Sequence, residues 1–397
     1  MAASFAPAVA SARELPPAQE RVAVAALALA AFALNLNTNV MGPLQQFMPA
    51  ATLPYGQHSF GWMVAAAALG SAIGALLSGP WIDRTGRRRP LLYGMLAFVV
   101  ISALHCVVSG FIALLVLRAA SGVVVGIAYA SASTLAAELV PYQRRARTMG
   151  IFTAGMFLAI PVGLPLANLL AQAGHWQGIF LVQAVFGALG LWFAWRAVPA
   201  DAGAAAWIAP WRLLGRLPVA AALAAVLLHV GSFFTTVQLA SGWLDRPNLV
   251  PKEQQQWLWI VLGLACAAGS FVFGGVADRF GKRNFVLASS VALFVSLIGL
   301  VGASTLPVVA SLGLLLAVAA AARTGPLQAL TSGLVPAHEL GSLMGLRAFF
   351  MQAGVGLIAP LAGSLANDHG FDAVLLLAGG CQVGSYLAIR LFVPEAR

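Results

Sequence analysis

Residues 79–88 of this chain read Gly-Pro-Trp-Ile-Asp-Arg-Thr-Gly-Arg-Arg, and residues 274–283 repeat the pattern as Gly-Gly-Val-Ala-Asp-Arg-Phe-Gly-Lys-Arg. The two stretches keep their glycines, their acidic residue and their basic residues at a constant shift of 195 residues. The same shift relates four further pairs: Trp62 and Trp257, Pro141 and Pro336, Met149-Gly150 and Met344-Gly345, and Pro165 and Pro360. One register held from residue 62 to residue 360 predicts two copies of one structural unit.

The composition is that of a membrane protein. Hydrophobic residues make up 60% of the 397 residues, and charged residues only 9%, whereas a soluble domain carries roughly 25% charged residues. Twelve apolar runs between polar breaks are long enough to cross a bilayer as helices. We therefore predict an all-α membrane protein with twelve transmembrane helices in two pseudo-symmetric six-helix bundles. The predicted parts are a tail (1–21), a first bundle (22–197), a linker (198–217) and a second bundle (218–397).

The net charge of +10 comes from short basic clusters between apolar runs, namely Arg84–Arg89, Arg144–Arg147, Arg196–Arg216 and Arg279–Arg283. This distribution is typical of cytoplasmic loops and argues against a nucleic-acid partner. It places both termini in the cytoplasm, and the first residues lack a cleavable signal pattern. We expect a multi-pass protein of a bacterial cytoplasmic (inner) membrane, with lipid headgroups near its basic loops.

The two repeated stretches resemble the signature between helices two and three of the major facilitator superfamily. Arg118 with Gly122 and Gly126 is similar to the family's fourth-helix motif. Residues 155–168, followed by Gly174-His175-Trp176-Gln177-Gly178-Ile179-Phe180, resemble the drug:proton antiporter (arabinose-efflux-permease-like) branch. The resemblance implies a secondary transporter in which two bundles rock around a site at the middle of the membrane.

The same resemblance implies a gate on the cytoplasmic side. An aspartate near a helix N-terminus is stabilised by the free amides and the dipole of that helix. Asp83 is expected to cap helix eleven near Gly341, and Asp278 to cap helix five near Arg147. The alternative is that the basic runs only fix the topology. The predicted gating residues are Gly79, Asp83, Arg84, Gly86, Arg87, Arg88, Glu138, Gly274, Asp278, Arg279, Gly281, Lys282 and Arg283.

Two arginines, Arg118 and Arg323, lie deep inside apolar runs, where a charge costs ~2.5 kcal/mol or more. Neither has an acidic residue at comparable depth in the sequence. Each is predicted to bind either backbone carbonyls or an anionic guest, and bracing between helices is an equal alternative for Arg118. Arg323 has no counterpart in the repeat, since Ala128 occupies the equivalent position.

Polar residues in other spans are candidates for the substrate cavity, because an amide facing lipid is costly. In the antiporter branch an acidic residue often stands near the place of Asn37, so a simple proton relay through a carboxylate of the first helix is not expected here. His229 is the remaining candidate for proton coupling, although a packing role competes with it. The predicted substrate-binding residues are Asn35, Asn37, Asn39, Arg118, His229, Gln238, Arg323, Gln328 and Gln352.

No enzyme, metal or cofactor motif is recognisable, and the three cysteines have no metal or redox spacing. The favoured function is proton-coupled efflux of small amphipathic compounds by alternating access. The alternative is an exchanger, symporter or facilitator of a small organic anion bound by Arg118 and Arg323. A non-transporting membrane sensor is a third, remote interpretation. The expected partners are a small-molecule substrate, protons and lipids, and a monomer suffices.

Overall fold

The computed structural model describes residues 16–39, 41–44, 48, 57–199, 209–244 and 252–395. The described residues form twelve long helices: α1 Pro17–Asn39, α3 Gln57–Thr85, α4 Arg88–His105, α5 Phe111–Glu138, α6 Arg145–Gln172, α7 Gly178–Ala197, α8 Leu217–Leu244, α9 Lys252–Phe280, α10 Lys282–Gly299, α11 Leu306–Ser332, α12 Leu340–His369 and α13 Phe371–Phe392. The short segments between them are α2 Met41–Leu44 and three 3-10 turns, η2 Tyr142–Arg144, η3 Pro210–Gly215 and η4 Ala337–Glu339.

Eleven of the described helices are long and apolar enough to cross a membrane. The remaining long helix, α4, begins with Arg88-Arg89-Pro90, and these polar residues lower its mean hydropathy. Large apolar side chains on the outer faces are more than half exposed, including Leu77 on α3, Val116 on α5 and Leu391 on α13. Lipid is the solvent that suits such a surface. The prediction of an all-α multi-pass membrane protein is confirmed.

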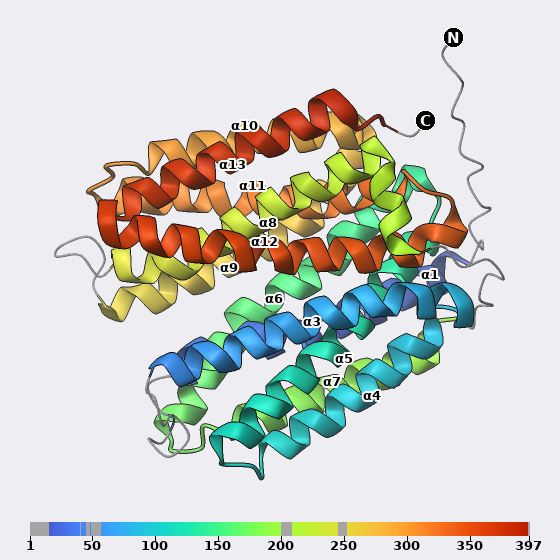
Figure 1. The fold of residues 1–397 in the computed structure, drawn as a ribbon, viewed down its shortest axis with the longest axis horizontal. Coiled ribbons are helices and arrows are strands. Elements are labelled where there is room, and N and C mark those ends of the chain that lie inside the picture. Colours follow the sequence, from blue (N-terminus) through green and yellow to red (C-terminus); the bar gives the residue numbers. More distant parts are fainter. Residues whose placement is uncertain are drawn as a thin grey trace.

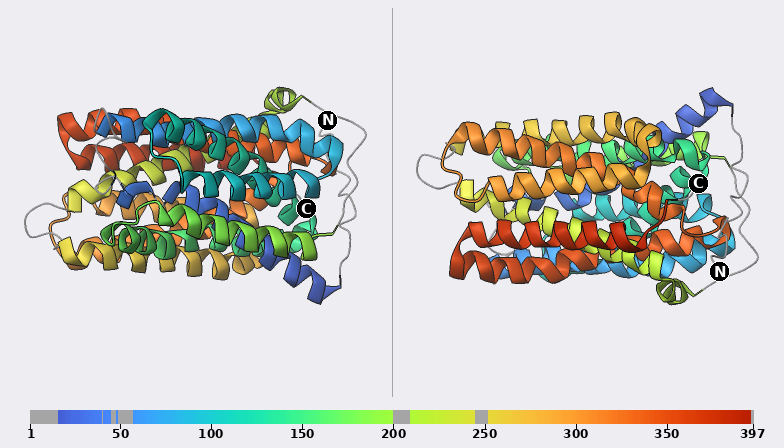
Figure 2. Two further views of the ribbon diagram at one scale, coloured as in Figure 1. Left: turned by 90° about the horizontal axis from the view of Figure 1, so that it is seen from below. Right: turned by 90° about the horizontal axis from the view of Figure 1, so that it is seen from above.

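The helices form two bundles, α1 and α3–α7 in one and α8–α13 in the other (Figure 1). The bundles meet where α3 packs against α12 and α6 packs against α9. Helices α10 and α13 lie on the far side of the second bundle, and α4 lies on the far side of the first (Figure 1). The views from below and above show the helices running roughly parallel to one another, with both chain ends at the same end of the molecule (Figure 2).

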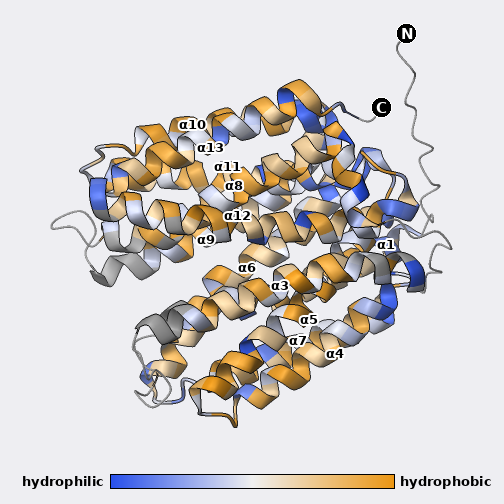
Figure 3. Cartoon of the chain, in the orientation of Figure 1, coloured by the Kyte–Doolittle hydropathy of each residue, from blue (hydrophilic) through white to orange (hydrophobic). Residues whose placement is uncertain are grey.

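Polar residues gather at the end of the molecule where the termini lie, and apolar residues cover the middle of the helices (Figure 3). We call this end the basic end, because it carries the clusters Arg84–Arg89, Arg144–Arg147 and Arg279–Arg283. The opposite end, where α4 turns into α5 and α10 turns into α11, is called the far end.

The 195-residue repeat of the sequence is also a repeat of contacts. A Cβ atom added to Gly345 would lie 2.4 Å from the carbonyl oxygen of Ala75, and one added to Gly150 would lie 2.4 Å from that of Ser270. Gly345 and Ala75 are the repeat equivalents of Gly150 and Ser270. These positions require glycine, because a Cβ would displace the backbone of the facing helix. The two interfaces between the bundles are therefore built alike.

Candidate functional site

The aspartate of the second repeated stretch joins the two bundles at the basic end. The carboxylate of Asp278, near the end of α9, accepts hydrogen bonds from the backbone N–H of Ala146 (3.1 Å) and Arg147 (2.8 Å) at the start of α6. This is the helix cap that the repeat predicts near Arg147. Lys282 pairs with the same carboxylate at 2.9 Å, and its ammonium lies 4.2 Å from the centre of the Tyr142 ring.

Arginines add two more links between the bundles at the basic end. Arg87 donates to Glu138 of its own bundle at 2.8 Å and to the carbonyl oxygen of Ala337 in the other bundle at 3.1 Å. Arg145 donates to the Ser332 hydroxyl across the interface at 3.1 Å. The predicted cap by Asp83 falls on a side chain outside the described part of the structure. The helix nevertheless approaches the start of α12 closely one turn earlier. A Cβ added to Gly79 would lie 2.7 Å from Cα of Ser342.

The other predicted gating residues shape the turns of the repeated stretches. Gly86 and Gly281 have φ of 85° and 89°, a conformation that favours glycine. Arg88 donates to the carbonyl oxygen of Trp195, and Arg283 to that of Arg390, both at 2.6 Å and both at equivalent positions of the repeat. Arg84 and Arg279 are exposed.

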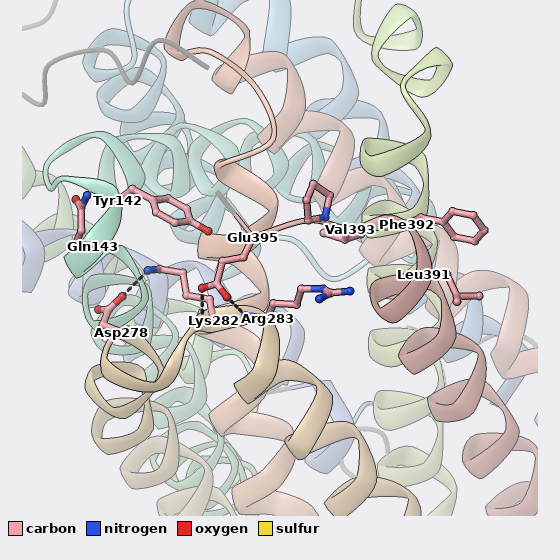
Figure 4. A pocket seen from close by; sticks show the side chains of 10 residues that line it. Tyr142, Gln143, Asp278, Lys282, Arg283, Leu391, Phe392, Val393 and Glu395 are labelled. Atoms are coloured by element: carbon pink, nitrogen blue, oxygen red, sulfur yellow. Dashed lines mark hydrogen bonds and ion pairs between the residues drawn. The ribbon is translucent and has the colours of Figure 1, made fainter. Parts of the chain in front are cut away.

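A polar hollow of about 710 Å³ opens beside this gate at the basic end. In Figure 4, Lys282 extends between Asp278 and Tyr142, and the Glu395 carboxylate faces the start of α10. That carboxylate accepts the backbone N–H of Lys282 at 2.6 Å and caps the helix. Near the same end, hydrogen bonding to Glu339 raises the pKa of the Arg216 guanidinium. The basic end is thus held by several charged contacts.

The first deep arginine, Arg118, binds a single partner within its own bundle. Its two terminal nitrogens donate to the side-chain oxygen and the backbone oxygen of Asn37, both at 2.8 Å. Arg118 and Asn37 are each 2% exposed. The pair connects α5 to α1, which is the bracing arrangement considered from the sequence.

The second deep arginine, Arg323, lies in the core of the second bundle. It donates to Ser290 of α10 at 2.7 Å and to Gln382 and Ser385 of α13 at 3.2 Å and 2.6 Å. Because α10 and α13 lie on the far side of this bundle from the interface (Figure 1), these bonds direct the guanidinium away from the other bundle. The equivalent positions in the first bundle hold apolar residues and glycines: Met95, Ala128, Gly187 and Gly190.

His229 belongs to the same network as Arg323. Its Nδ1 lies 3.3 Å from the amide oxygen of Gln382, and the Gln382 amide donates to Ser232 at 2.8 Å. The imidazole is 2% exposed. The predicted substrate and proton roles of His229 and Arg323 stay predictions, and the hydrogen-bond partners of both residues belong to one bundle.

The remaining predicted cavity residues differ in burial. Asn35 donates to the carbonyl oxygen of Ala31 at 2.9 Å. Gln328 on α11 is fully buried, and neither its amide nitrogen nor its amide oxygen has a hydrogen-bond partner among the described residues. Gln352 on α12 is half-buried. The side chains of Asn39 and Gln238 lie outside the described part of the structure.

A third deep arginine, Arg347 on α12, was missed by the sequence reasoning. It is 2% exposed, and its guanidinium interacts with the Tyr129 hydroxyl of α5, in the other bundle. Its other contact is the thioether sulfur of Met351 at 3.4 Å. The repeat pairs Arg347 with Phe152 of α6. This mismatch of a charged residue with an apolar one could have revealed Arg347 from the sequence. Arg347 therefore places a cation between the bundles.

No group of three or more His, Cys, Asp or Glu side chains that could hold a metal ion is found where the structure describes side chains. Interhelical contacts of hydroxyls, amides and guanidinium groups dominate the polar interior instead. Such an interior can bind polar groups of a guest.

A family model described as the Major Facilitator Superfamily matches residues 23–249 and 242–397. The "Uncharacterized MFS-type transporter YceJ" of Bacillus subtilis is 27% identical over 271 residues, which cover 65% of this chain and 67% of that protein. A "Probable sugar efflux transporter" of Helicobacter pylori is 25% identical over 243 residues, or 60% of each chain. The matches thus span about two thirds of these relatives, or less.

Solved structures share the whole architecture. The crystal structure of the human organic anion transporter MFSD10 superposes with a TM-score of 0.79. The superposition covers 94% of this chain and 100% of that one, at 18% sequence identity. At this identity the likeness concerns the fold alone.

Proposed function

The chain belongs to the Major Facilitator Superfamily, and from that premise we propose that it carries a small organic solute across the cytoplasmic membrane by alternating access. The observation that supports this most is the pair of equivalent glycine contacts between the bundles, Gly345 with Ala75 and Gly150 with Ser270. Two smooth, symmetric interfaces let two rigid bundles rock about the site between them. Each bundle has buried apolar clusters of its own, while a further cluster runs across the interface and must part when the bundles rock.

The described form is closed at the basic end. Asp278 holds α6 to α9, and Arg87 and Arg145 reach across the other contacts. These links are polar and individually modest, since a charge at a helix N-terminus contributes about 0.3–1 kcal/mol. A gate of this kind opens without a large energetic barrier. We assign the predicted gating residues to this role, with the basic end in the cytoplasm by the positive-inside rule.

The proposed direction is export. The name of the Helicobacter pylori relative, a probable sugar efflux transporter, supports this choice. Coupling to protons through His229 is the accompanying proposal, because no acidic residue lies deep in a span: every Asp and Glu stands in the first or last turn of a helix or between helices. His229 is a buried side chain of the second bundle that can carry a proton.

A second candidate cargo, a small organic anion, is favoured by one specific observation. Three arginines, Arg118, Arg323 and Arg347, are buried within the spans, and among the described side chains no carboxylate balances them there. Arg stays charged in proteins. The interior therefore has a positive potential that attracts anions and disfavours lipophilic cations.

Flux into proteoliposomes tests the proposed function. The probes are arabinose, tetraphenylphosphonium and benzoate, each with and without a pH gradient. We expect saturable flux of at least one probe in the wild type and in Gly363→Val, whose position has no neighbouring atom within 4 Å. Gly345→Val should abolish that flux, because its side chain prevents closure against α3.

Equal flux in Gly345→Val and the wild type, or no flux above empty liposomes, would contradict the proposal. Loss of gradient stimulation in His229→Gln would support the proton role.

A further inference from the structure

Arg347 is the least satisfied of the three buried arginines. Arg118 donates to two oxygens and Arg323 to three, all within one bundle. Arg347 reaches one phenol oxygen, that of Tyr129, and one thioether sulfur, a weak acceptor. The Nε of each of the three arginines has no partner among the described residues, so the difference lies in the acceptors of the terminal nitrogens. A guanidinium with five N–H groups is left with unused donors.

The position of Arg347 distinguishes it from the other two arginines. It lies seven residues after the start of α12, about 10 Å along the helix axis from the basic end. Helix α12 packs against α5 of the other bundle, and Tyr129, whose hydroxyl interacts with Arg347, is on α5. Any motion that separates α5 from α12 removes the Tyr129 oxygen and leaves the cation facing the opened space.

The surroundings of Arg347 are apolar and aromatic. The Tyr129 ring packs against Phe152 with centroids 5.4 Å apart, and its hydroxyl lies 3.6 Å from the sulfur of Met156. Phe152 is the repeat equivalent of Arg347, so one position supplies a cation from α12 and a ring from α6. A guest here meets a charge on one side and rings and thioethers on the other.

We propose that Arg347 binds the carboxylate of a small organic acid with an apolar body when the bundles part at the basic end. The planar guanidinium matches a carboxylate in a bidentate fork, and a low-dielectric setting strengthens that pairing. In the closed form the Tyr129 hydroxyl takes the place of one carboxylate oxygen. The exchange of a phenol for a carboxylate links binding of the anion to opening of the gate. The inference rests on the proposed transport function and names its cargo.

The test measures binding to the purified full-length protein by the rise in melting temperature with ligand concentration. The probes are benzoate and hexanoate, and benzamide and hexanamide serve as their neutral counterparts. We expect at least one acid to stabilise the wild type while its amide does not. Arg347→Gln should weaken that binding at least about tenfold, since a charge-assisted pair is lost. Arg347→Lys keeps the charge but cannot form the bidentate pair, so its affinity for the acid should lie between those of the wild type and Arg347→Gln.

A matched control is Arg89→Gln, which removes an exposed cation at the basic end and should leave binding unchanged. The proposal is overturned if amides bind as well as acids, if neither acid stabilises the wild type, or if Arg347→Gln binds as tightly as the wild type. The acid and amide comparison uses only wild-type protein, so it holds even if Arg347→Gln fails to fold. If arabinose is transported but no acid binds, this inference alone is contradicted. If no probe is transported, the proposed function is contradicted.

Discussion

At the scale of single residues, the three buried arginines show how the same side chain serves different purposes. Arg118 ties α5 to α1 through one asparagine, and Arg323 ties α11 to α10 and α13 through hydroxyls and an amide. Arg347 crosses between bundles and keeps unused donors. A buried cation whose hydrogen bonds stay within one rigid unit stabilises that unit, and one that faces a moving interface can bind a ligand.

The contacts of Arg323 predict a role in stability. Arg323→Leu removes the hydrogen bonds to Ser290, Gln382 and Ser385 and leaves these buried groups without that partner, which costs about 1–3 kcal/mol for each unsatisfied group. We expect a lower melting temperature and an unchanged half-saturation concentration for transport. The control is Ser311→Ala, on the exposed face of the same helix. An unchanged melting temperature with altered half-saturation would instead support the substrate contact predicted from the sequence.

The sequence predicts residue roles where the repeat or a motif fixes the partner, and fails where the partner is on a distant helix. The cap between Asp278 and the start of α6 follows from the repeated stretch and is found near Arg147. The partners of Arg323 are 33 to 62 residues away in the chain, and no spacing rule connects them. Arg347 was overlooked because it stands close to the predicted start of its helix, although its side chain is buried.

At the scale of helices, the glycines decide how closely the bundles approach. Gly345 and Gly150 let α12 and α6 lie against carbonyl groups of α3 and α9. Helices with small residues at their crossing gain van der Waals contact without interlocking side chains. Such surfaces can separate and close again, whereas interlocked side chains would resist the motion. The twelve spans and the repeat follow from hydropathy and register, but the close approach of these helix pairs required the structure.

The Asp278 cap predicts a measurable bias toward the closed form. Asp278→Asn keeps an acceptor for the amides of α6 but loses the charge that favours the helix N-terminus and pairs with Lys282. We expect the ratio of closed to open molecules to fall about fivefold, corresponding to about 1 kcal/mol. Spin-label distances across the basic end report this ratio. Asp372→Asn is the control, since Asp372 contacts Gly302 within one bundle at the far end; an equal shift in both variants would contradict a specific role for the cap.

At the scale of the whole molecule, we propose that the two bundles rock as rigid bodies and that the contacts at the basic end form the gate. The charged links between the bundles gather at the basic end, through Asp278, Arg87 and Arg145, while Ser270 of α9 donates to the carbonyl oxygen of Gly150 deeper in the interface. Each bundle has buried clusters of its own, one more cluster runs across the interface, and the proposed cargo site lies between the bundles. Alternating access then requires the two ends to move in opposite senses.

The most direct test is a pair of distances measured by double electron–electron resonance after the three native cysteines are replaced. One pair of labels, at Arg89 and His338, spans the basic end, and the other, at Gly110 and Ser304, spans the far end; all four positions are exposed. In Gly345→Val, relative to Gly363→Val, the account predicts a longer distance at the basic end together with a shorter distance at the far end. Unchanged distances, or lengthening at both ends, would contradict rigid-body alternation.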